Sequence, residues 1–376
     1  MSDGVWSDLV GQERAVQVFK SAVEGAMTHA WLITGPPGSG RSTSAVAFAA
    51  ALQCPNNGCG ECKDCQMVLD GTHADVTVID TEGLSIGVDT AREVVRRAAM
   101  FPSVGEWQII IVEDADRLTE QAANALLKSI EEPSPKTVWF LCAPFAEDVL
   151  VTIRSRSRLV VLATPPVDTV AAYLVRKDGV DPESAKFIAS ASQGHIGRAR
   201  ALARDQEAQA RRRDIVALPM RMRSLADVMS AASQIVAEAQ SRAETQCDEL
   251  DAKELTALQS SWGVEEKGKR PTGYAGALSA LKKDQDSRRK RIARDEIDRV
   301  LIELMSALRD VLSVQLDTGQ PLVNPDVQQS IQEFAIRTTA KKTLASLDAI
   351  MHCRQALGAN AAPQIAMESM FVRMVS

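Results

Sequence analysis

Residues 35–42 read Gly35-Pro36-Pro37-Gly38-Ser39-Gly40-Arg41-Ser42, and this stretch decides the fold of the first half of the chain. It matches the phosphate-loop spacing G-x4-G-K-[ST] everywhere except at the lysine. Loop glycines let backbone N–H groups converge on phosphates at a helix N-terminus, where the helix dipole favours an anion. The stretch therefore predicts a strand, a loop and a helix, with a nucleotide site in the loop.

The replaced lysine sets the chemistry expected of that site. Arg41 is bulky and planar where a lysine would place a compact charge on the β- and γ-phosphates, so the exchange is not conservative. The candidate nucleotide-binding residues of the loop are Gly35, Pro36, Gly38, Ser39, Gly40, Arg41, Ser42 and Thr43. We expect weak binding of ATP or ADP at most, and little hydrolysis.

Apolar runs on both sides of the loop indicate an α/β domain. Such continuous runs are expected for parallel strands that are buried on both faces. The expected strands are residues 30–34, 76–79, 108–112 and 138–141. The helices expected between them are residues 42–52, 89–100 and 120–130.

Two acids follow the third of these strands. Proteins that hydrolyse nucleotides place an Asp there to hold magnesium, and then a Glu to orient the attacking water. Here the order is inverted, as Glu113 and Asp114. The inversion moves both carboxylates by about a bond length, which catalysis that depends on positioning tolerates poorly. We interpret the site as a degenerate nucleotide site that holds Mg²⁺ poorly; the alternative is that exposed acids simply end a buried strand.

Four cysteines follow the helix after the phosphate loop. Cys54, Cys59, Cys62 and Cys65 have the spacing C-x4-C-x2-C-x2-C. Four thiolates suit a closed tetrahedral Zn²⁺ site, which keeps no open position for catalysis, so we expect a structural zinc. An iron–sulfur cluster is less favoured because the downstream Cys-Pro of ferredoxins is missing, and disulfides are less favoured because no secretion signal is seen.

The rest of the chain reads as helical. A length of 376 residues allows two or three domains. The strand pattern stops after Pro165-Pro166, and a later apolar stripe marks one helix face for core or subunit packing: Ile297, Val300, Leu301, Leu304, Leu308, Val311 and Leu312. Residues 240–294 are rich in charged and small side chains, and we interpret them as an exposed, partly disordered insertion.

Charge and hydropathy exclude some functions. A formal net charge of −6 argues against tight binding of nucleic acid by the chain alone, because phosphate contacts need a basic surface. No apolar stretch approaches the roughly 18 residues that a membrane span needs, and the first residues lack a signal-peptide pattern. We expect a cytoplasmic protein without a membrane partner.

Two segments resemble those of one protein family, the AAA+ subunits of bacterial clamp loaders. Residues 124–133 read Asn124-Ala125-Leu126-Leu127-Lys128-Ser129-Ile130-Glu131-Glu132-Pro133, which is similar to the family's N-A-L-L-K-x-L-E-E-P segment. Residues 153–158 resemble its S-R-C motif, with Ser157 in the place of Cys. Residues 8–12, residues 29–32 and the cysteines extend the resemblance over about residues 5–200, and residues 360–368 resemble the final collar helix more loosely.

The resemblance implies an architecture and a set of partners. It predicts a RecA-like AAA+ domain at 1–165 with the zinc module at 54–65, a small helical lid at 166–213, and a helical collar at 214–376 that carries the insertion and oligomerises. The assembly implied is a pentamer of delta, three gamma or tau subunits and delta-prime. Such an assembly opens the sliding clamp and loads it onto primed DNA.

Within that family, the altered residues are similar to those of the non-hydrolysing delta-prime type. Besides Arg41 and the inverted acids, Ala143-Pro144 stand where motor subunits place threonines that sense the γ-phosphate. Gly197 stands in the place of their sensor arginine, with Arg198 beside it. We therefore expect no efficient ATP turnover by this chain alone.

The resemblance also implies a role in trans for Arg156. In this family the arginine of the S-R-C motif reaches the γ-phosphate on the neighbouring motor, as an arginine finger. The alternative is an ordinary surface arginine, since Arg154 and Arg158 lie beside it. Two other functions stay open: an active motor subunit that hydrolyses ATP, and a zinc-bearing DNA-repair scaffold whose basic insertion holds DNA.

Overall fold

The computed structural model describes residues 4–80, 85–264 and 271–375. These residues form two compact units, the first at 4–80 and 85–204 and the second at 205–264 and 271–375. The boundary between the units lies between α9 (Ile196–Arg204) and α10 (Gln206–Arg221). The domain limit expected at residue 213 falls inside α10.

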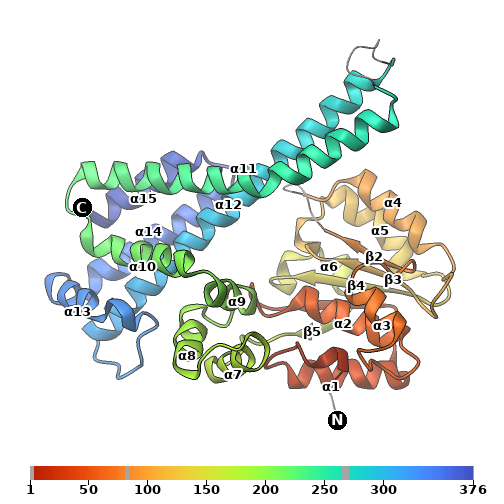
Figure 1. Cartoon of the computed structure of the whole chain (residues 1–376), viewed down its shortest axis with the longest axis horizontal. Helices are drawn as coiled ribbons and strands as arrows, with labels where there is room; N and C mark the ends of the chain where they lie inside the picture. Colours follow the sequence, from red (N-terminus) through yellow and green to blue (C-terminus); the bar gives the residue numbers. More distant parts are fainter. Residues whose placement is uncertain (1–3, 81–84, 265–270, 376) are drawn as a thin grey trace. The chain divides into compact units, whose positions relative to one another are not determined.

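The first unit contains a five-stranded parallel sheet in the order β2-β3-β4-β1-β5 (Figure 1). The strands are β1 (Ala30–Thr34), β2 (Val76–Ile79), β3 (Gln108–Val112), β4 (Thr137–Ala143) and β5 (Arg158–Val161). Thr34 at the end of β1 pairs with Ala143 of β4 and with Val161 of β5, so the carboxyl ends of these strands meet at one edge.

Helices cover both faces of this sheet. The helices of the first unit are α1 (Glu13–Ser21), α2 (Arg41–Gln53), α3 (Lys63–Leu69), α4 (Val88–Ala98), α5 (Glu120–Glu131), α6 (Val151–Arg154), α7 (Val167–Asp178), α8 (Pro182–Ala191) and α9. Trp31 and Ile33 of β1 pack in one core cluster with Phe48 of α2, whereas Ala30 and Leu32 pack in another with α4 and α5. Burial of both faces explains the continuous apolar runs of β1, β3 and β4, and the α/β class predicted for this half is confirmed.

The edge strand β5 has a weaker sequence signal than the other strands. Only Val160 of its four residues is buried, while Leu159 and Val161 are 47% and 67% exposed. A short strand with so few buried side chains has no continuous apolar run, and the sequence analysis did not identify it.

The second unit is entirely helical in its described part. Its helices are α10, α11 (Leu225–Ser261), α12 (Tyr274–Gln315), α13 (Gln328–Arg337), α14 (Ala340–Gly358) and α15 (Pro363–Val375). Leu301, Leu304 and Leu308 of the predicted apolar stripe are buried in its core, together with Ile350 of α14 and Phe371 of α15. Among the described helices of the whole chain, none is both long and apolar enough to span a membrane.

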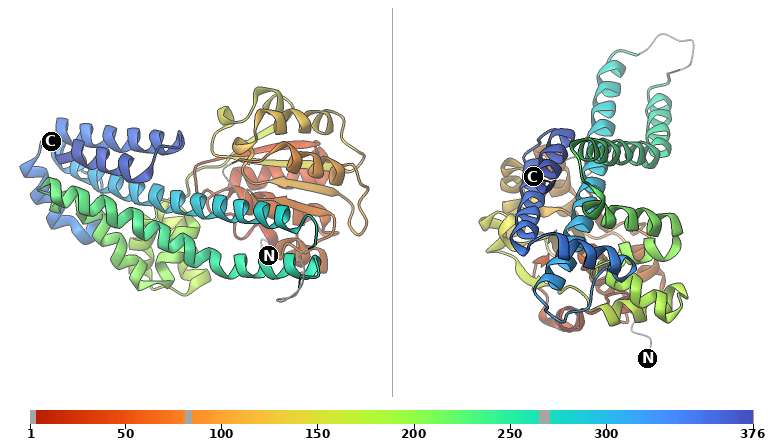
Figure 2. Two further views of the ribbon diagram at one scale, coloured as in Figure 1. Left: turned by 90° about the horizontal axis from the view of Figure 1, so that it is seen from above. Right: turned by 90° about the vertical axis from the view of Figure 1, so that its left-hand side faces the viewer.

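Most of the charged segment 240–294 is helical, at residues 240–261 and 274–294. These residues belong to α11 and α12, which run side by side (Figures 1 and 2). The buried guanidinium of Arg288 lies 2.7 Å from Asp251 and 2.5 Å from Glu254 of the facing helix. In the described part of the segment, the charges of Arg288, Asp251 and Glu254 thus neutralise one another between two helices. The interpretation of the segment as a partly disordered insertion stays a prediction. Residues 265–270 of the segment lie outside the described residues.

Candidate functional site

The phosphate loop lies at the carboxyl end of β1, where the strand order changes direction. Strands β2, β3 and β4 lie on one side of β1, and β5 lies on the other. In open α/β sheets, ligands bind at the carboxyl ends of the strands in the crevice at such a switch point. Residues 35–42 therefore occupy the place in this fold where a ligand site is expected.

Two glycines give the loop its shape. Gly38 and Gly40 have φ angles of 84° and 90°, in the left-handed region that residues with a side chain disfavour. A Cβ atom on Gly38 would lie 2.2 Å from Cγ of His195, whereas a Cβ atom on Gly40 would meet nothing within 4 Å. A glycine at position 38 thus allows both the left-handed backbone turn and the close approach of the segment before α9.

Arg41 folds back over the loop from the first position of α2. Its Nη1 donates a hydrogen bond to the carbonyl oxygen of Gly35. A phosphate group in the loop would have to compete with this carbonyl for the guanidinium. The contact supports the expectation of weak nucleotide binding, which stays a prediction.

Glu113 and Asp114 lie at the same edge of the sheet as the loop. They follow the end of β3, which only β4 separates from β1, so the two segments are about 10 Å apart. Arg117 Nε lies 3.9 Å from Asp114 Oδ2. Burial raises the pKa of Asp116 and the charge of Asp114 adds to this, while Arg117 and Arg41 oppose it. The structure thus brings Arg41 and the acids within electrostatic range of one another.

The residues after β4 and at the start of α9 offer the loop no hydroxyl group. Ala143 is buried at the end of β4, and the carbonyl oxygen of Pro144 accepts a hydrogen bond from the Gly35 N–H at 3.2 Å. Gly197 lies in the first turn of α9 and has no side chain. No side-chain hydrogen-bond donor for a phosphate is therefore available at Ala143, Pro144 or Gly197.

Arg156 lies at the opposite edge of the sheet from the phosphate loop. It precedes β5, whose first residue Arg158 pairs with Trp31 near the amino end of β1. Gly35 follows Trp31 by four residues, which corresponds to about 13 Å of strand, roughly twice the length of an extended arginine side chain. Arg156 therefore cannot reach the loop of its own chain, and any nucleotide that it contacts belongs to another chain.

The contacts of Arg156 hold its guanidinium at the surface. Its Nε lies 2.5 Å from Oε1 of Glu131, and the side chain is 40% exposed. Its Nη1 donates to the carbonyl oxygen of Thr152 at 2.9 Å and to Oγ of Ser155 at 3.2 Å.

The two neighbouring arginines are turned towards the body of the chain. Arg154 Nη1 donates to the carbonyl oxygen of Ala146 at 3.4 Å. The guanidinium of Arg158 lies 4.8 Å from the ring centroid of Trp31, in a cation–π contact. Among residues 4–80, 85–264 and 271–375, an ion pair is seen for Arg156, with the exposed carboxylate of Glu131, and for neither of its two neighbours.

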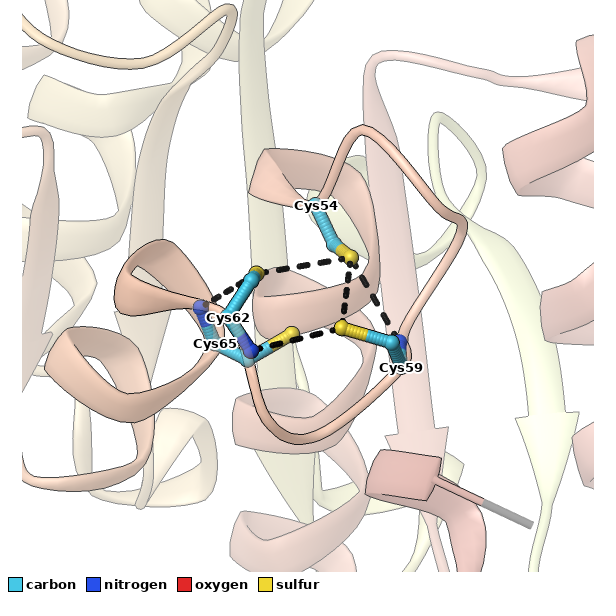
Figure 3. A group of neighbouring side chains, drawn as sticks. All are labelled: Cys54, Cys59, Cys62 and Cys65. Carbon is cyan, nitrogen blue, oxygen red and sulfur yellow. Dashed lines mark hydrogen bonds between the residues drawn. The ribbon is translucent and has the colours of Figure 1, made fainter. Parts of the chain in front are cut away.

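The four cysteines meet between the end of α2 and the start of α3 (Figure 3). Their sulfur atoms all lie within 4.8 Å of one another. Cys54 Sγ lies 3.6 Å from Cys59 Sγ and 3.7 Å from Cys62 Sγ. Four sulfur atoms bound at 2.3 Å to one tetrahedral ion are about 3.8 Å apart. The cluster therefore has the dimensions to hold a metal ion.

Backbone amides also prepare these sulfur atoms to bind a metal. Burial raises the pKa of Cys54, but hydrogen bonds from the N–H groups of Cys59, Gly58 and Asn56 outweigh it and lower the pKa to about 7. The Cys65 N–H donates to Cys62 Sγ at 3.4 Å, which caps α3. The pKa of Cys65 is raised by burial, and that of Cys62 is raised as well, with the neighbouring thiols contributing to both shifts. Thiolates are the form that binds metals, so without an ion Cys54 is the better prepared ligand of these three.

Sequence reasoning missed two residues that support the phosphate loop. The buried Gln12 donates from Nε2 to the carbonyl oxygens of Ala163 at 2.7 Å and Ser39 at 3.2 Å, and its Oε1 accepts from the Ala163 N–H at 3.1 Å. It thus ties the loop to the segment after β5. The second residue that sequence reasoning missed is His195, which packs on Gly38. Neither residue belongs to a local pattern that indicates these contacts.

Comparisons with known proteins agree on one family. A family model described as "DNA polymerase III, delta subunit" matches residues 11–166, and one described as "DNA polymerase III, delta subunit, C terminal" matches residues 289–374. The DNA polymerase III subunit delta' of Escherichia coli K12 is 36% identical over 189 residues, 49% of this chain and 57% of that protein. The delta' subunit of Pseudomonas aeruginosa PAO1 is 40% identical over 134 residues, 34% of this chain and 41% of that protein.

A gamma/tau subunit is also similar to this chain. The gamma/tau subunit of Mycobacterium bovis is 32% identical over 191 residues, 48% of this chain and 33% of that protein. The matched stretches thus span between a third and three fifths of these relatives. The two family models together cover more than half of the chain, and with the delta' relatives they show that it belongs to the DNA polymerase III delta-subunit family.

Proposed function

We propose that this chain is a delta-prime-type subunit of a bacterial clamp loader, which offers Arg156 to a nucleotide on a neighbouring motor subunit while its own nucleotide site turns over little ATP. The observation that carries the proposal is the separation of the two sites. Residues 35–42 and Arg156 lie at opposite edges of one parallel sheet, so the chain has one edge that receives a nucleotide and one that faces a nucleotide elsewhere.

Charge at Arg156 suits phosphoryl transfer in a neighbouring subunit. A fixed cation supplied in trans stabilises the negative charge that develops on the transferred phosphoryl group, and such arginines contribute about 10³ to 10⁵ in rate. Arg156 is exposed, anchored by its own chain and unable to fold onto its own loop. These are the properties that an arginine acting in trans requires.

The residues around the chain's own phosphate loop support the proposal that this chain hydrolyses little ATP itself. Arg41 is engaged by the Gly35 carbonyl, and the acids after β3 stand in inverted order. Ala143 offers no hydroxyl group at the end of β4. We propose that ATP or ADP binds weakly at residues 35–43 and that Mg²⁺ is held poorly between the loop and Glu113 and Asp114.

The four cysteines are proposed to hold a structural Zn²⁺. Their sulfur spacing fits a tetrahedral ion, and four thiolates leave no coordination position open for a substrate. Val5 N–H donates to the carbonyl oxygen of Gly58 at 3.0 Å, so the metal loop also holds the N-terminal segment with its buried Trp6. The metal would therefore stabilise the first unit rather than take part in a reaction.

The proposed partners follow from the family. They are the gamma or tau motors, the delta subunit, the sliding clamp, and primer–template DNA reached through the complex. The helical second unit is proposed as the collar that joins the subunits. A cytoplasmic location is the corresponding proposal.

The 32% identity to a gamma/tau subunit favours one alternative, an active motor subunit. That alternative requires Arg41 and the inverted acids to support catalysis. Purified chain that hydrolyses ATP at several turnovers per second without partners would favour it.

The proposal is tested by reconstitution with the Arg156→Ala variant. The loader is assembled from this chain and the motor and delta subunits of the same organism, and DNA-stimulated ATPase and clamp loading are measured. We expect the variant to lower kcat by at least about tenfold, since arginines of this kind contribute about 10³ to 10⁵ in rate at the site that they contact. Arg154→Ala serves as the matched control, and equal rates for Arg156→Ala and the unchanged chain would remove the proposed role.

A further inference from the structure

We propose that Glu131 is a positioning residue for Arg156, which fixes the guanidinium so that one nitrogen is left to meet a phosphate on the neighbouring subunit. This inference rests on the proposed function. It assigns the positioning of Arg156 to the carboxylate of Glu131, which lies about 25 residues earlier in the sequence. The inference is based on the ion pair between Glu131, at the end of α5, and Arg156, which precedes β5.

The guanidinium is held on two of its three nitrogens. Glu131 Oε1 lies 2.5 Å from Nε, and Nη1 is bound to the carbonyl oxygen of Thr152 and to Oγ of Ser155. Within the described part of the chain, the hydrogen bonds of this guanidinium are made by Nη1, and Nη2 donates none. The planar group therefore has a defined orientation, with the Nη2 edge left for a ligand.

The pair is poorly explained as a stabiliser of the fold. Both side chains are about two fifths exposed, at 40% and 41%, and exposed ion pairs contribute little to stability. Glu131 is also the last residue of α5, where the negative end of the helix dipole disfavours a carboxylate. An acid at this position is unfavourable for the helix itself, and its visible effect is to orient Arg156.

Orientation matters because catalysis by a fixed charge depends on its placement. A displacement of about 1 Å can cost on the order of 10² in rate. An arginine held only through Nη1 can swing about its remaining torsions, so fewer of its conformations direct Nη2 outwards. We therefore expect loss of the carboxylate to lower kcat, on the order of tenfold, while KM for ATP changes little.

The test uses the complete reconstituted loader with Glu131→Gln, which has the same shape without the charge. Glu131→Asp keeps the charge on a shorter side chain, and Glu132→Gln removes the adjacent exposed carboxylate as a matched control. Each change is made with Arg156 present and in the Arg156→Ala variant, and DNA-stimulated kcat and KM are measured. We expect Glu131→Gln to lower kcat only when Arg156 is present, Glu131→Asp to recover part of the rate, and Glu132→Gln to have no effect.

The outcomes separate this inference from the proposed function. If Arg156→Ala has no effect on kcat, the proposed function fails and this inference with it. If Arg156→Ala is slow but Glu131→Gln matches the unchanged chain, only the positioning role is lost. A faster Glu131→Gln would mean that the carboxylate restrains the arginine, and a loss that persists in the Arg156→Ala background would mean a structural role; either result overturns the inference.

Discussion

His195 and Gly38 are in closer contact than any side chain at position 38 would allow. A Cβ atom built on Gly38 would lie 2.2 Å from Cγ of His195 and 2.6 Å from its Cα. The segment before α9 therefore packs directly on the backbone of the phosphate loop. This contact joins the helices after the sheet to the candidate nucleotide site.

Gly38→Ala is expected to destabilise the first unit by more than Gly40→Ala. Both changes force a residue with a side chain into the left-handed region, at a cost of about 1–3 kcal/mol. Only Gly38→Ala adds the clash with His195, because space is open beside Gly40. Urea unfolding of the two variants measures the difference in the free energy of unfolding. Equal costs at the two positions would show that His195 moves aside freely.

Asp75 is expected to make stability depend on pH in the acid range. Its carboxylate accepts hydrogen bonds at 2.7 Å from the N–H groups of Ser103, Val104 and Gly105 and from the Ser103 hydroxyl. Burial raises the pKa of Asp75, but these bonds outweigh it and lower the pKa from 3.8 to about 2. Because the pKa is lowered in the folded protein, the carboxylate contributes its full stabilisation at pH values above its ordinary pKa of 3.8. This stabilisation is lost as the pH falls towards the lowered pKa of about 2.

The Asp75→Asn variant measures this contribution. The shift corresponds to about 2 kcal/mol at neutral pH, which we expect the variant to lose. Its difference from the unchanged chain should shrink as the pH is lowered from 5 to 2.5. Urea unfolding over that range provides the measurement, and the exposed Asp70→Asn is the control. A difference that stays constant with pH would contradict the role of the charged carboxylate.

Removal of the metal is expected to lower the melting temperature of the first unit. The four thiolates would repel one another without an ion, and the loop that binds the N-terminal segment would lose its constraint. Metal analysis of the purified protein should find one zinc per chain, and thermal unfolding with and without a chelator measures its effect. In the double variant Cys59→Ser, Cys62→Ser, the chelator should change nothing further. Protein that contains no metal and melts at the same temperature with chelator would rule out the zinc.

The buried ion pair of the second unit gives the fourth prediction. Arg212 Nε lies 3.1 Å from Glu303 Oε2, and both side chains are at most 5% exposed. Arg212→Ala removes the guanidinium that neutralises the buried carboxylate of Glu303, so we expect a loss of about 3–5 kcal/mol in the free energy of unfolding. The adjacent Arg213 is 58% exposed beside Asp326, and Arg213→Ala should cost less than about 1 kcal/mol. Similar losses for the two variants would contradict this account.

The sequence predicted the elements whose signals are local. The apolar runs predicted four of the five strands; β1, β3 and β4 are buried on both faces, and β2 is a partly buried run of Val, Thr, Val and Ile. The glycine spacing predicted the loop after β1. The cysteine spacing predicted the cluster because all four ligands lie within twelve consecutive residues, 54–65.

What the sequence could not predict depends on contacts between distant segments. Gln12 meets Ala163 across 151 residues, and no local pattern marks either residue. The sequence analysis did not predict the pairing of α11 with α12, because composition alone does not show that Arg288 is neutralised by Asp251 of the facing helix. Glu131 was seen only as part of a family segment, since its contact with Arg156 forms in three dimensions.

The parallel sheet also keeps substitutions near residues 35–42 away from the surroundings of Arg156. About 13 Å of strand lies between the edge that carries residues 35–42 and the edge that carries Arg156. Substitutions at Arg41 or Glu113 therefore have no direct contact through which to disturb Glu131, Thr152 or Arg156. If Arg156 acts in trans as proposed, the first edge is under relaxed selection and the second under constraint, so sequences from related organisms should vary more at the first edge than at the second.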